Sequence, residues 1–176
     1  MISVPLDRRL VLLRHAKSAY PHGVPDHDRP LLGRGRRNAR AAGEWFATEG
    51  PAPDLVLCSD AVRAVQTWEI VSARLLTRPE TRIEPGLYGA EPDELDQLVR
   101  MAPDRATTLL VVGHEPTLSL CALRLAGEGS DPQSAHQIAL KFPTNAVAVL
   151  RFRGAWRDLR PARAVLETFA VPRAVG

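Results

Sequence analysis

Short runs of wholly apolar residues, separated by longer amphipathic stretches, restrict the fold of this sequence more than any other feature. Strands are predicted at residues 10–13, 54–58 and 107–112, because each of these segments contains four consecutive apolar residues. Such runs are typical of strands that are buried on both faces of a parallel sheet. The alternation with helical stretches predicts an α/β fold, a three-layer sandwich with a mostly parallel central sheet flanked by helices.

The stretches between these strands show the periodicity of amphipathic helices. Residues 34–49 carry a stripe of apolar and small side chains at helical spacing, and a second stripe predicts a helix over residues 61–76. Pro116 suits the first position of a further helix that includes residues 118–123. The remaining predicted elements are a helix at 92–101 and strands at 81–84, 146–152 and 164–171.

The composition fits one domain over residues 1–176, since 45% of the residues are hydrophobic and 24% are charged. A chain of this length buries enough apolar surface to fold without a disulfide or a metal. Cys58 and Cys121 both lie in apolar runs, so we expect two core thiols. Neither has another Cys or a His at the spacing of a zinc site, and we expect no metal or other cofactor.

The first nine residues carry their charges after a short apolar stretch, which is not the pattern of a secretory signal. No apolar run reaches the roughly 18 residues of a membrane helix. We therefore expect a cytoplasmic protein that does not bind membranes. The net charge is +3, and only two of the 23 basic residues are lysines. Because guanidinium is a planar fork that suits phosphate and carboxylate, this excess of arginine predicts an anionic partner.

Polar residues whose side chains can take part in catalysis or ligand binding follow three of the predicted strands directly. Arg14 and His15 come after the first strand, Ser59 and Arg63 after the second, and His114 after the strand at 107–112. Ligands of open parallel sheets bind outside the carboxyl ends of the strands. The three segments are therefore expected to converge on one pocket.

The segment after the second strand favours an anion site. Ser59 or Asp60 is expected to accept the free N–H groups at the helix start, which places Arg63 in the first turn. An arginine there reverses the usual preference for an acid and makes sense if an anion binds. Thr67, one turn further on, is positioned to brace the Arg63 guanidinium. The alternative is that Arg63 simply pairs with Asp60.

Three segments together resemble the signature of the histidine phosphatase superfamily, also called phosphoglycerate mutase-like. They are Leu13-Arg14-His15-Ala16-Lys17-Ser18, Ser59 to Thr67, and Val111-Val112-Gly113-His114-Glu115-Pro116. The short length, Asp26-His27-Asp28-Arg29-Pro30-Leu31 and Gly35-Arg36-Arg37 resemble its small bacterial branch, the SixA-type phosphohistidine phosphatases. The resemblance covers roughly residues 10 to 150, in order and with compatible spacing.

The resemblance implies a role for each matching residue. His15 would be the nucleophile and carry a phosphohistidine intermediate. Arg14, Arg63 and His114 would donate to the transferring phosphoryl group, and Arg29 and Ser18 are expected as further substrate-binding residues. The arginines would take the place of a metal, and they are expected to lower the pKa of His15 so that it stays neutral near pH 7.

Two departures from the family pattern stand out. Many members have Gly after the nucleophile, whereas this chain has Ala16, and we expect a small adjustment without loss of activity. The general acid is also unassigned. Glu115 follows His114, where some relatives carry the donor, although it is equally placed to cap the helix that begins at Pro116. Glu84, Asp26 and Asp28 are the other candidates.

A weak general acid favours phosphohistidine as the substrate, because imidazole is a better leaving group than an alkoxide and needs less protonation. Only about 30 residues separate the helix near residue 76 from the strand near residue 107, too few for the lid that covers small sugar phosphates in relatives. We therefore expect a phosphohistidine phosphatase of signal transduction, with a phosphohistidine-bearing protein as partner. The alternatives are a phosphatase or mutase of a small metabolite, and a non-catalytic phosphate-binding regulator.

Other polar features favour less specific interpretations. The basic stretch from Arg34 to Arg37, with Arg40, is interpreted as a solvated helix face, because aromatic residues are only 5% of the chain and none interleaves with it. No nucleic-acid partner is therefore expected. His22 and His27 lie in a loop rich in Pro and Gly, where exposure or substrate contact is favoured over metal binding. His136 has no partner in the sequence.

Overall fold

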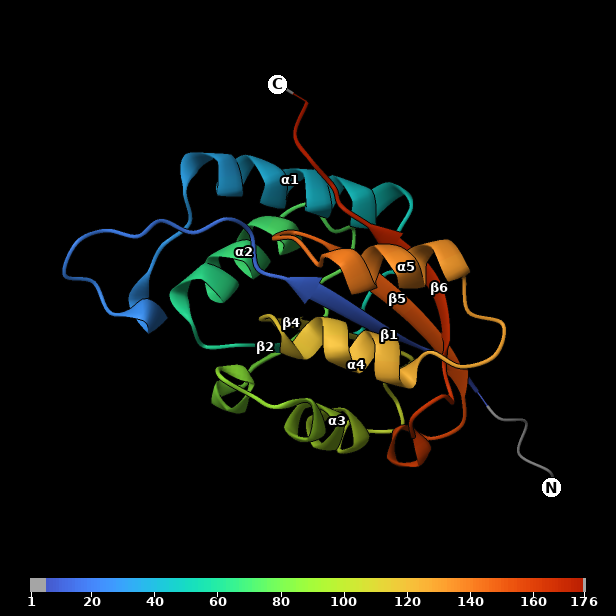
Figure 1. Cartoon of the computed structure of the whole chain (residues 1–176). Helices are drawn as coiled ribbons and strands as arrows, with labels where there is room; N and C mark the ends of the chain where they lie inside the picture. The colour runs from blue at the N-terminus through green and yellow to red at the C-terminus, as the bar shows by residue number, and fades with distance from the viewer. Residues whose placement is uncertain (1–5, 176) are drawn as a thin grey trace.

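The computed structural model describes residues 6–175. One six-stranded sheet, in the order β3-β2-β4-β1-β5-β6, runs through the centre of the molecule with helices on both sides (Figure 1). The strands are β1 (Asp7–Arg14), β2 (Leu55–Cys58), β3 (Glu80–Ile83), β4 (Thr108–Gly113), β5 (Val147–Arg153) and β6 (Val165–Ala170). The helices are α1 (Gly33–Thr48), α2 (Val62–Ser72), α3 (Pro92–Arg100), α4 (Thr117–Leu125) and α5 (Pro132–Leu140).

The sheet is mixed and mostly parallel. Strands β1, β2, β3 and β4 pair in parallel, whereas β5 pairs antiparallel with both β1 and β6. The predicted three-layer α/β sandwich is therefore confirmed, and β5 alone runs opposite to the other five strands. The carboxyl ends of β2, β4 and β1 lie next to one another, because these three strands are neighbours in the sheet.

Alternate residues of the central strands pack against different helices, which explains why the middle of each strand is a continuous apolar run. Leu10 and Leu12 belong to a core shared with α3, α4 and α5, whereas Val11 and Leu13 face a core shared with α1 and α2. Both cysteines are buried, Cys58 in the second of these cores and Cys121 in the first, as the sequence predicts. Burial raises the pKa of each thiol to about 12.

Helix α2 is shorter than its apolar stripe predicts, since it ends at Ser72 and not near residue 76. A tight turn follows, in which Arg74 N donates to Val71 O (3.0 Å) and Leu75 N donates to Ser72 O (3.2 Å). Leu75 nevertheless packs against the core. The apolar periodicity therefore continues beyond the residues that are helical.

Two further elements differ from prediction. Pro116 is the N-cap of α4 and not its first helical residue. Helix α5 was not predicted, because only two of its residues are buried and its apolar stripe is correspondingly weak. Asp131 caps α5 by accepting a hydrogen bond from Ser134 N (2.8 Å). No helix within residues 6–175 has the length and apolar character that crossing a bilayer requires.

Candidate active site

The predicted convergence of three segments occurs at the carboxyl ends of β1, β2 and β4. His15 N donates to Gly113 O (3.1 Å) and Ser59 N donates to Val112 O (3.0 Å), so the parallel hydrogen-bonding pattern continues just past the strands. These bonds hold the three segments side by side. In Figure 1 the site lies at the arrowhead of β1, where the chain leaves the sheet in a long blue segment before α1.

His15 is buried, with 6% of its surface exposed, and each ring nitrogen has one partner. Nδ1 lies 2.7 Å from the carbonyl oxygen of Ala16, and Nε2 lies 3.3 Å from Arg63 Nε. A carbonyl only accepts hydrogen bonds, so Nδ1 carries the proton. Nε2 then carries the one in-plane lone pair of the ring, which accepts from the Arg63 guanidinium on the side of the site.

The pKa of His15 is lowered to about 3, chiefly by burial and to a smaller extent by the charges of His114, Arg63 and Arg14, while the hydrogen bond to the Ala16 carbonyl opposes the shift. A lowered pKa for His15 is also predicted from the sequence, but with the arginines as its cause. Desolvation is the larger cause, because the ring follows a strand that is apolar on both faces. His15 is consequently neutral throughout the range near pH 7.

His114 faces His15, with 5.2 Å between the ring centroids. Its Nε2 lies 2.7 Å from the hydroxyl of Ser59, whereas its Nδ1 is buried and has no hydrogen-bond partner. Burial and the Arg63 charge lower the pKa of His114 to about 4. One nitrogen of a neutral imidazole therefore remains available to a ligand.

Arg14 is the second residue with an unsatisfied buried nitrogen. Its Nη1 donates to the carbonyl oxygen of Phe142 (2.8 Å), which fixes the guanidinium, but its Nε is buried without a partner. Burial lowers the pKa of Arg14, while the carboxylate of Glu115 opposes this effect. Buried donors without partners are costly, and an anion bound beside them would satisfy them.

Arg63 lies in the first turn of α2 as predicted, but its contacts differ from both interpretations of the sequence. The guanidinium donates to the Asp26 carbonyl (2.6 Å) and to the Asp26 carboxylate (3.1 Å), and no pairing with Asp60 is present. Thr67 donates to the Arg63 carbonyl (2.6 Å) and accepts from Ala16 N (2.9 Å). Thr67 therefore holds the backbone of the His15 segment and does not brace the guanidinium.

The expected cap at the start of α2 is also wrong. The N-cap is Ala61, which has no side-chain hydrogen bond to the helix, and neither Ser59 nor Asp60 accepts from the first turn. Ser59 instead accepts from Ala61 N (3.3 Å) and contacts His114. The free N–H groups at the start of α2 are thus left uncapped beside the site.

Arg29 and Ser18 lie together. Arg29 is buried, donates to Ser18 Oγ (2.9 Å) and to Asp26 Oδ1 (2.9 Å), and stacks on the ring of Tyr20 at 3.9 Å. The structure places both predicted residues in the segment between β1 and α1. Their direct contacts are with each other and with this segment, and Asp26 links them to Arg63.

Asp26 joins Arg29, Arg63 and Tyr88, and sequence reasoning missed Tyr88. The Tyr88 hydroxyl donates to Asp26 Oδ2 (2.8 Å), and its ring lies 5.7 Å from that of His114. The Tyr88 hydrogen bond, with the Arg63 and Arg29 charges, lowers the pKa of Asp26 to about 2. An acid this strong is ionised at neutral pH and is a poor proton donor. Tyr88 follows a short edge strand in a loop, and no local pattern distinguishes it.

Asn145 is the second residue that the sequence did not reveal. It is fully buried, adopts a left-handed backbone (φ 68°), and its N–H donates to the carbonyls of Arg14 (3.1 Å) and His15 (3.2 Å). Its side-chain amide donates to Asn38 O and Pro172 O, both at 2.8 Å. Asparagine tolerates this backbone better than most residues. An Asn in a short connection before a strand is the only signal, and it is weak.

The other candidate acids are engaged locally. Glu115 Oε1 accepts from Ser119 N (2.8 Å) in α4, which is the capping contact considered from the sequence. Glu84 accepts from Gly86 N (3.1 Å), and Asp28 lies 3.2 Å from His27 Nδ1. Of these three, Glu115 is the one whose charge acts on Arg14, so it lies closest to the site electrostatically.

The structure accommodates the methyl group by which Ala16 differs from glycine. Its methyl group is fully buried in a small cluster with Leu31 and Ala39, between the His15 segment and α1. The added carbon therefore fills a space in the core and does not point into the site.

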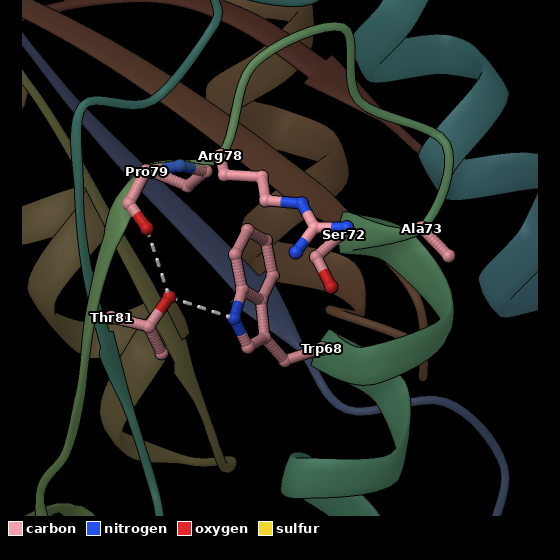
Figure 2. A pocket seen from close by; sticks show the side chains of 6 residues that line it. All are labelled: Trp68, Ser72, Ala73, Arg78, Pro79 and Thr81. Atoms are coloured by element: carbon pink, nitrogen blue, oxygen red, sulfur yellow. Dashed lines mark hydrogen bonds between the residues drawn. The ribbon is translucent and has the colours of Figure 1, made fainter.

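Two remaining features are the histidine His27 and a separate cavity beside Trp68. His27 contacts Asp60 (3.0 Å) and the Tyr88 ring, and residues 6–175 contain no group of three His, Cys, Asp or Glu side chains arranged for a metal. A cavity of about 370 Å³ lies between the C-terminal part of α2 and β3, beside Trp68 (Figure 2). Trp68 Nε1 donates there to Thr81 Oγ1 (3.1 Å), and the side chains drawn include no histidine.

Comparison with known proteins assigns the chain to a family. The model of the histidine phosphatase superfamily (branch 1) matches residues 10–90. A solved structure from Nakamurella multipartitia, provisionally assigned as a phosphohistidine phosphatase SixA, is 37% identical with a TM-score of 0.84, covering 97% of this chain and 99% of the other. The chain belongs to the histidine phosphatase superfamily.

Other proteins are also similar to this chain. An uncharacterized protein of Mycobacterium tuberculosis is 49% identical over 162 residues, which cover 92% of this chain and all of the relative. A provisionally assigned SixA of Agrobacterium tumefaciens is 28% identical with a TM-score of 0.79, covering 94% and 98% of the two chains. A phosphoglycerate mutase of Plasmodium falciparum, 15% identical with a TM-score of 0.60 over 97% and 95%, shares the fold.

Proposed function

We propose that this histidine phosphatase hydrolyses the phosphoryl group of a phosphohistidine on another protein, through a covalent intermediate on His15. The observation that carries the proposal is the state of His15: its Nδ1–H is bound to the Ala16 carbonyl, and its Nε2 lone pair faces the Arg63 guanidinium. A neutral imidazole held in this tautomer can attack phosphorus through Nε2 once the oxygens of a bound phosphoryl group take over the Arg63 donor.

The surrounding donors match a phosphoryl group. Arg14 Nε and His114 Nδ1 are buried without partners, and the guanidinium of Arg63 lies directly beside His15 Nε2. If Ser59 donates to His114 Nε2, then His114 Nδ1 carries a proton and is a donor. Preorganised donors of this kind stabilise charge on the oxygens of the transferring group without reorganisation.

The reaction proceeds in two displacements. His15 Nε2 attacks phosphorus, the bond between phosphorus and the substrate imidazole breaks, and the leaving nitrogen takes the electron pair and then a proton. Water next attacks the phosphorylated His15, which releases inorganic phosphate and restores the free imidazole. Arg14, Arg63 and His114 contact the phosphoryl oxygens in both steps, and Arg29 with Ser18 supports the outer side of the pocket through Asp26.

Phosphohistidine is the substrate class whose leaving group depends least on protonation by a general acid. Asp26 is held ionised, and Glu115 is engaged in capping α4, so neither is free to protonate a poor leaving group. An imidazole leaving group needs less protonation than an alkoxide. The 37% identity to a protein provisionally assigned as a phosphohistidine phosphatase supports the same substrate class.

The proposal is tested by comparing hydrolysis of a phosphohistidine peptide, p-nitrophenyl phosphate and glucose 6-phosphate by the full chain. We expect kcat/KM to be highest for the peptide, and His15→Ala to lower it by at least about 1,000-fold, since no other group is placed to replace the nucleophile. A peptide labelled with ³²P should transfer acid-labile label to the wild type but not to His15→Ala.

The matched control is His136→Ala, because His136 is exposed on α5 away from the site. It should keep wild-type kinetics. Activity that survives in His15→Ala refutes the covalent mechanism. Faster hydrolysis of glucose 6-phosphate indicates a phosphatase of small metabolites, and phosphate binding without turnover indicates a regulator.

A further inference from the structure

A strongly basic cleft adjoins the candidate active site. It has a volume of about 440 Å³ and is lined by five cationic side chains, from Arg14, Lys17, Arg34, Lys141 and Arg173. The other lining residues are uncharged, so within the described range 6–175 no carboxylate side chain lines the cleft. Both lysines of the chain belong to this set.

Four separate parts of the chain build the cleft. Arg14 and Lys17 flank His15, Arg34 lies at the start of α1, Lys141 follows α5, and Arg173 lies in the C-terminal segment. Figure 1 shows this last segment leaving β6 and passing beside α1, where Ala174 N donates to Asn38 Oδ1 (3.1 Å). The cations are therefore brought together only by the fold, and a fixed tail holds one of them.

The arrangement costs electrostatic energy in the absence of an anion. Partial burial and the like charge of Arg34 lower the pKa of Arg173, and the Arg173 guanidinium donates to the Thr144 carbonyl (2.8 Å), with no ion pair to a side-chain carboxylate among residues 6–175. Elsewhere on the surface arginines pair with acids, as Arg82 and Arg105 do with Glu80. An unpaired group of like charges beside a phosphate site favours an anionic ligand.

The geometry favours a ligand that carries several separate negative charges over a single compact anion. A single phosphate binds best where buried donors converge, and only Arg14 provides such a donor here. Arg34, Lys141 and Arg173 carry exposed side chains around the opening. Carboxylates distributed along a protein surface match this pattern, since exposed charges at an interface rim steer and orient a partner.

We propose that this basic cleft docks acidic side chains that flank the phosphohistidine of the protein substrate, and so selects substrates by the charge around the phosphorylated residue. The inference deepens the proposed function and rests on it. Arg14 belongs to both sites and places the docked surface directly beside the phosphoryl group. The cleft thereby distinguishes a phosphoprotein with acidic surroundings from one with neutral surroundings.

The test uses two phosphohistidine peptides that differ only in the residues next to the phosphohistidine, four glutamates in one and four serines in the other. The wild type is expected to hydrolyse the glutamate peptide with a kcat/KM about tenfold higher at low salt, and this preference should shrink as salt screens the charges. In the triple variant Arg34→Glu, Lys141→Glu, Arg173→Glu, the preference should fall to about one or reverse.

The matched control reverses three exposed arginines that do not line the cleft: Arg40→Glu, Arg78→Glu and Arg163→Glu. It has the same net charge as the cleft variant and should keep most of the preference. Equal kcat/KM for both peptides in the wild type overturns the inference. So does an equal loss of preference in the two triple variants, because the effect would then be one of net charge alone.

A binding measurement separates this inference from the proposed function. Fluorescence anisotropy with the unphosphorylated glutamate peptide reports on the cleft without catalysis, and the cleft variant should bind it at least about fivefold more weakly than the control variant. If no phosphohistidine peptide is hydrolysed but this difference persists, the proposed function fails and the docking surface stands. If the wild type binds inorganic pyrophosphate in the cleft but not the peptide, a small polyanion is the ligand and the inference is wrong.

Discussion

His15 has a buried ring and a single backbone hydrogen bond at Nδ1, and together these decide which nitrogen reacts. The Ala16 carbonyl accepts from Nδ1, so the lone pair is on Nε2, and desolvation keeps the ring neutral. Arg63 lies at hydrogen-bond distance from that lone pair without protonating it. The nucleophile proposed for this site is thus prepared before any substrate binds.

Glu115 is the remaining candidate for the general acid whose charge acts on the site. Glu115→Gln keeps an oxygen that can accept from Ser119 N, so the cap of α4 and the stability should be retained. We expect hydrolysis of phosphohistidine and of a monoester with an alkyl leaving group each to change by less than about threefold, because Glu115 is held in the cap; a fall of about tenfold for the monoester alone would show that Glu115 donates the proton. Steady-state kinetics on both substrates measure the two effects.

Glu115→Ala is the companion variant, because it removes the cap as well and should lower the free energy of unfolding by about 1 kcal/mol. A large loss of phosphohistidine hydrolysis in Glu115→Gln, with unchanged stability, would show that the acid is needed even for an imidazole leaving group. That result would weaken the argument from leaving-group chemistry and leave the fold unaffected.

Among the elements, α1 and the segment after β1 depend on each other. Leu32 N donates to Lys17 O (2.9 Å), and Gly35 in the first turn of α1 lies against the Lys17 backbone. A Cβ on Gly35 would lie 2.1 Å from Lys17 O. The start of α1 therefore fixes the path of the chain two residues after His15.

Gly35→Ala is expected to push α1 and the His15 segment apart, because backbone atoms cannot yield as a flexible side chain does. We expect the free energy of unfolding to fall by about 1–3 kcal/mol and kcat/KM to fall by at least about tenfold, since the position of the nucleophile changes. Urea unfolding and phosphohistidine hydrolysis measure the two quantities.

Gly33→Ala is the matched control in the same turn. A Cβ at Gly33 meets only the Arg37 side chain, at 3.7 Å, so stability should change by less than about 1 kcal/mol and activity should be retained. Equal effects of the two substitutions would mean that helix propensity matters here and close packing does not.

The whole molecule should lose stability in mild acid because it buries two neutral histidines. The pKa values of His15 and His114 are about 3 and about 4 in the folded protein, below the ordinary value of 6.5. Between pH 7 and pH 5 the unfolded chain therefore binds protons that the folded protein does not, and stability falls as the pH falls. For the two residues we expect a loss of about 2–4 kcal/mol over this range.

Urea unfolding at several pH values measures this loss in His27→Gln and in the same protein with His15→Gln and His114→Gln added. The His27→Gln background is needed because Asp60 and Asp28 raise the pKa of His27, which opposes the trend. The triple variant should show a clearly flatter dependence on pH. Identical slopes in the two proteins would show that the buried histidines are not the groups that titrate.

Much of the fold and the centre of the site could be predicted from local patterns. The continuous apolar strands reveal a sheet covered on both faces, and Arg14, His15, Arg63 and His114 are recognisable because each follows a strand directly or lies in the first helical turn beyond it. These features are visible because strand burial and the position of a strand end depend on consecutive residues.

Only the tertiary structure decided which groups meet over long sequence separations. It pairs Asp26 with Tyr88, turns Ser59 towards His114, uses Thr67 to hold the Ala16 backbone, and joins Arg34, Lys141 and Arg173 in one cleft. The sequence by itself determined the layered fold and the residues at its strand ends. Side-chain partners and the desolvation that controls the pKa of His15 depend on how distant segments pack, and no local pattern encodes that packing.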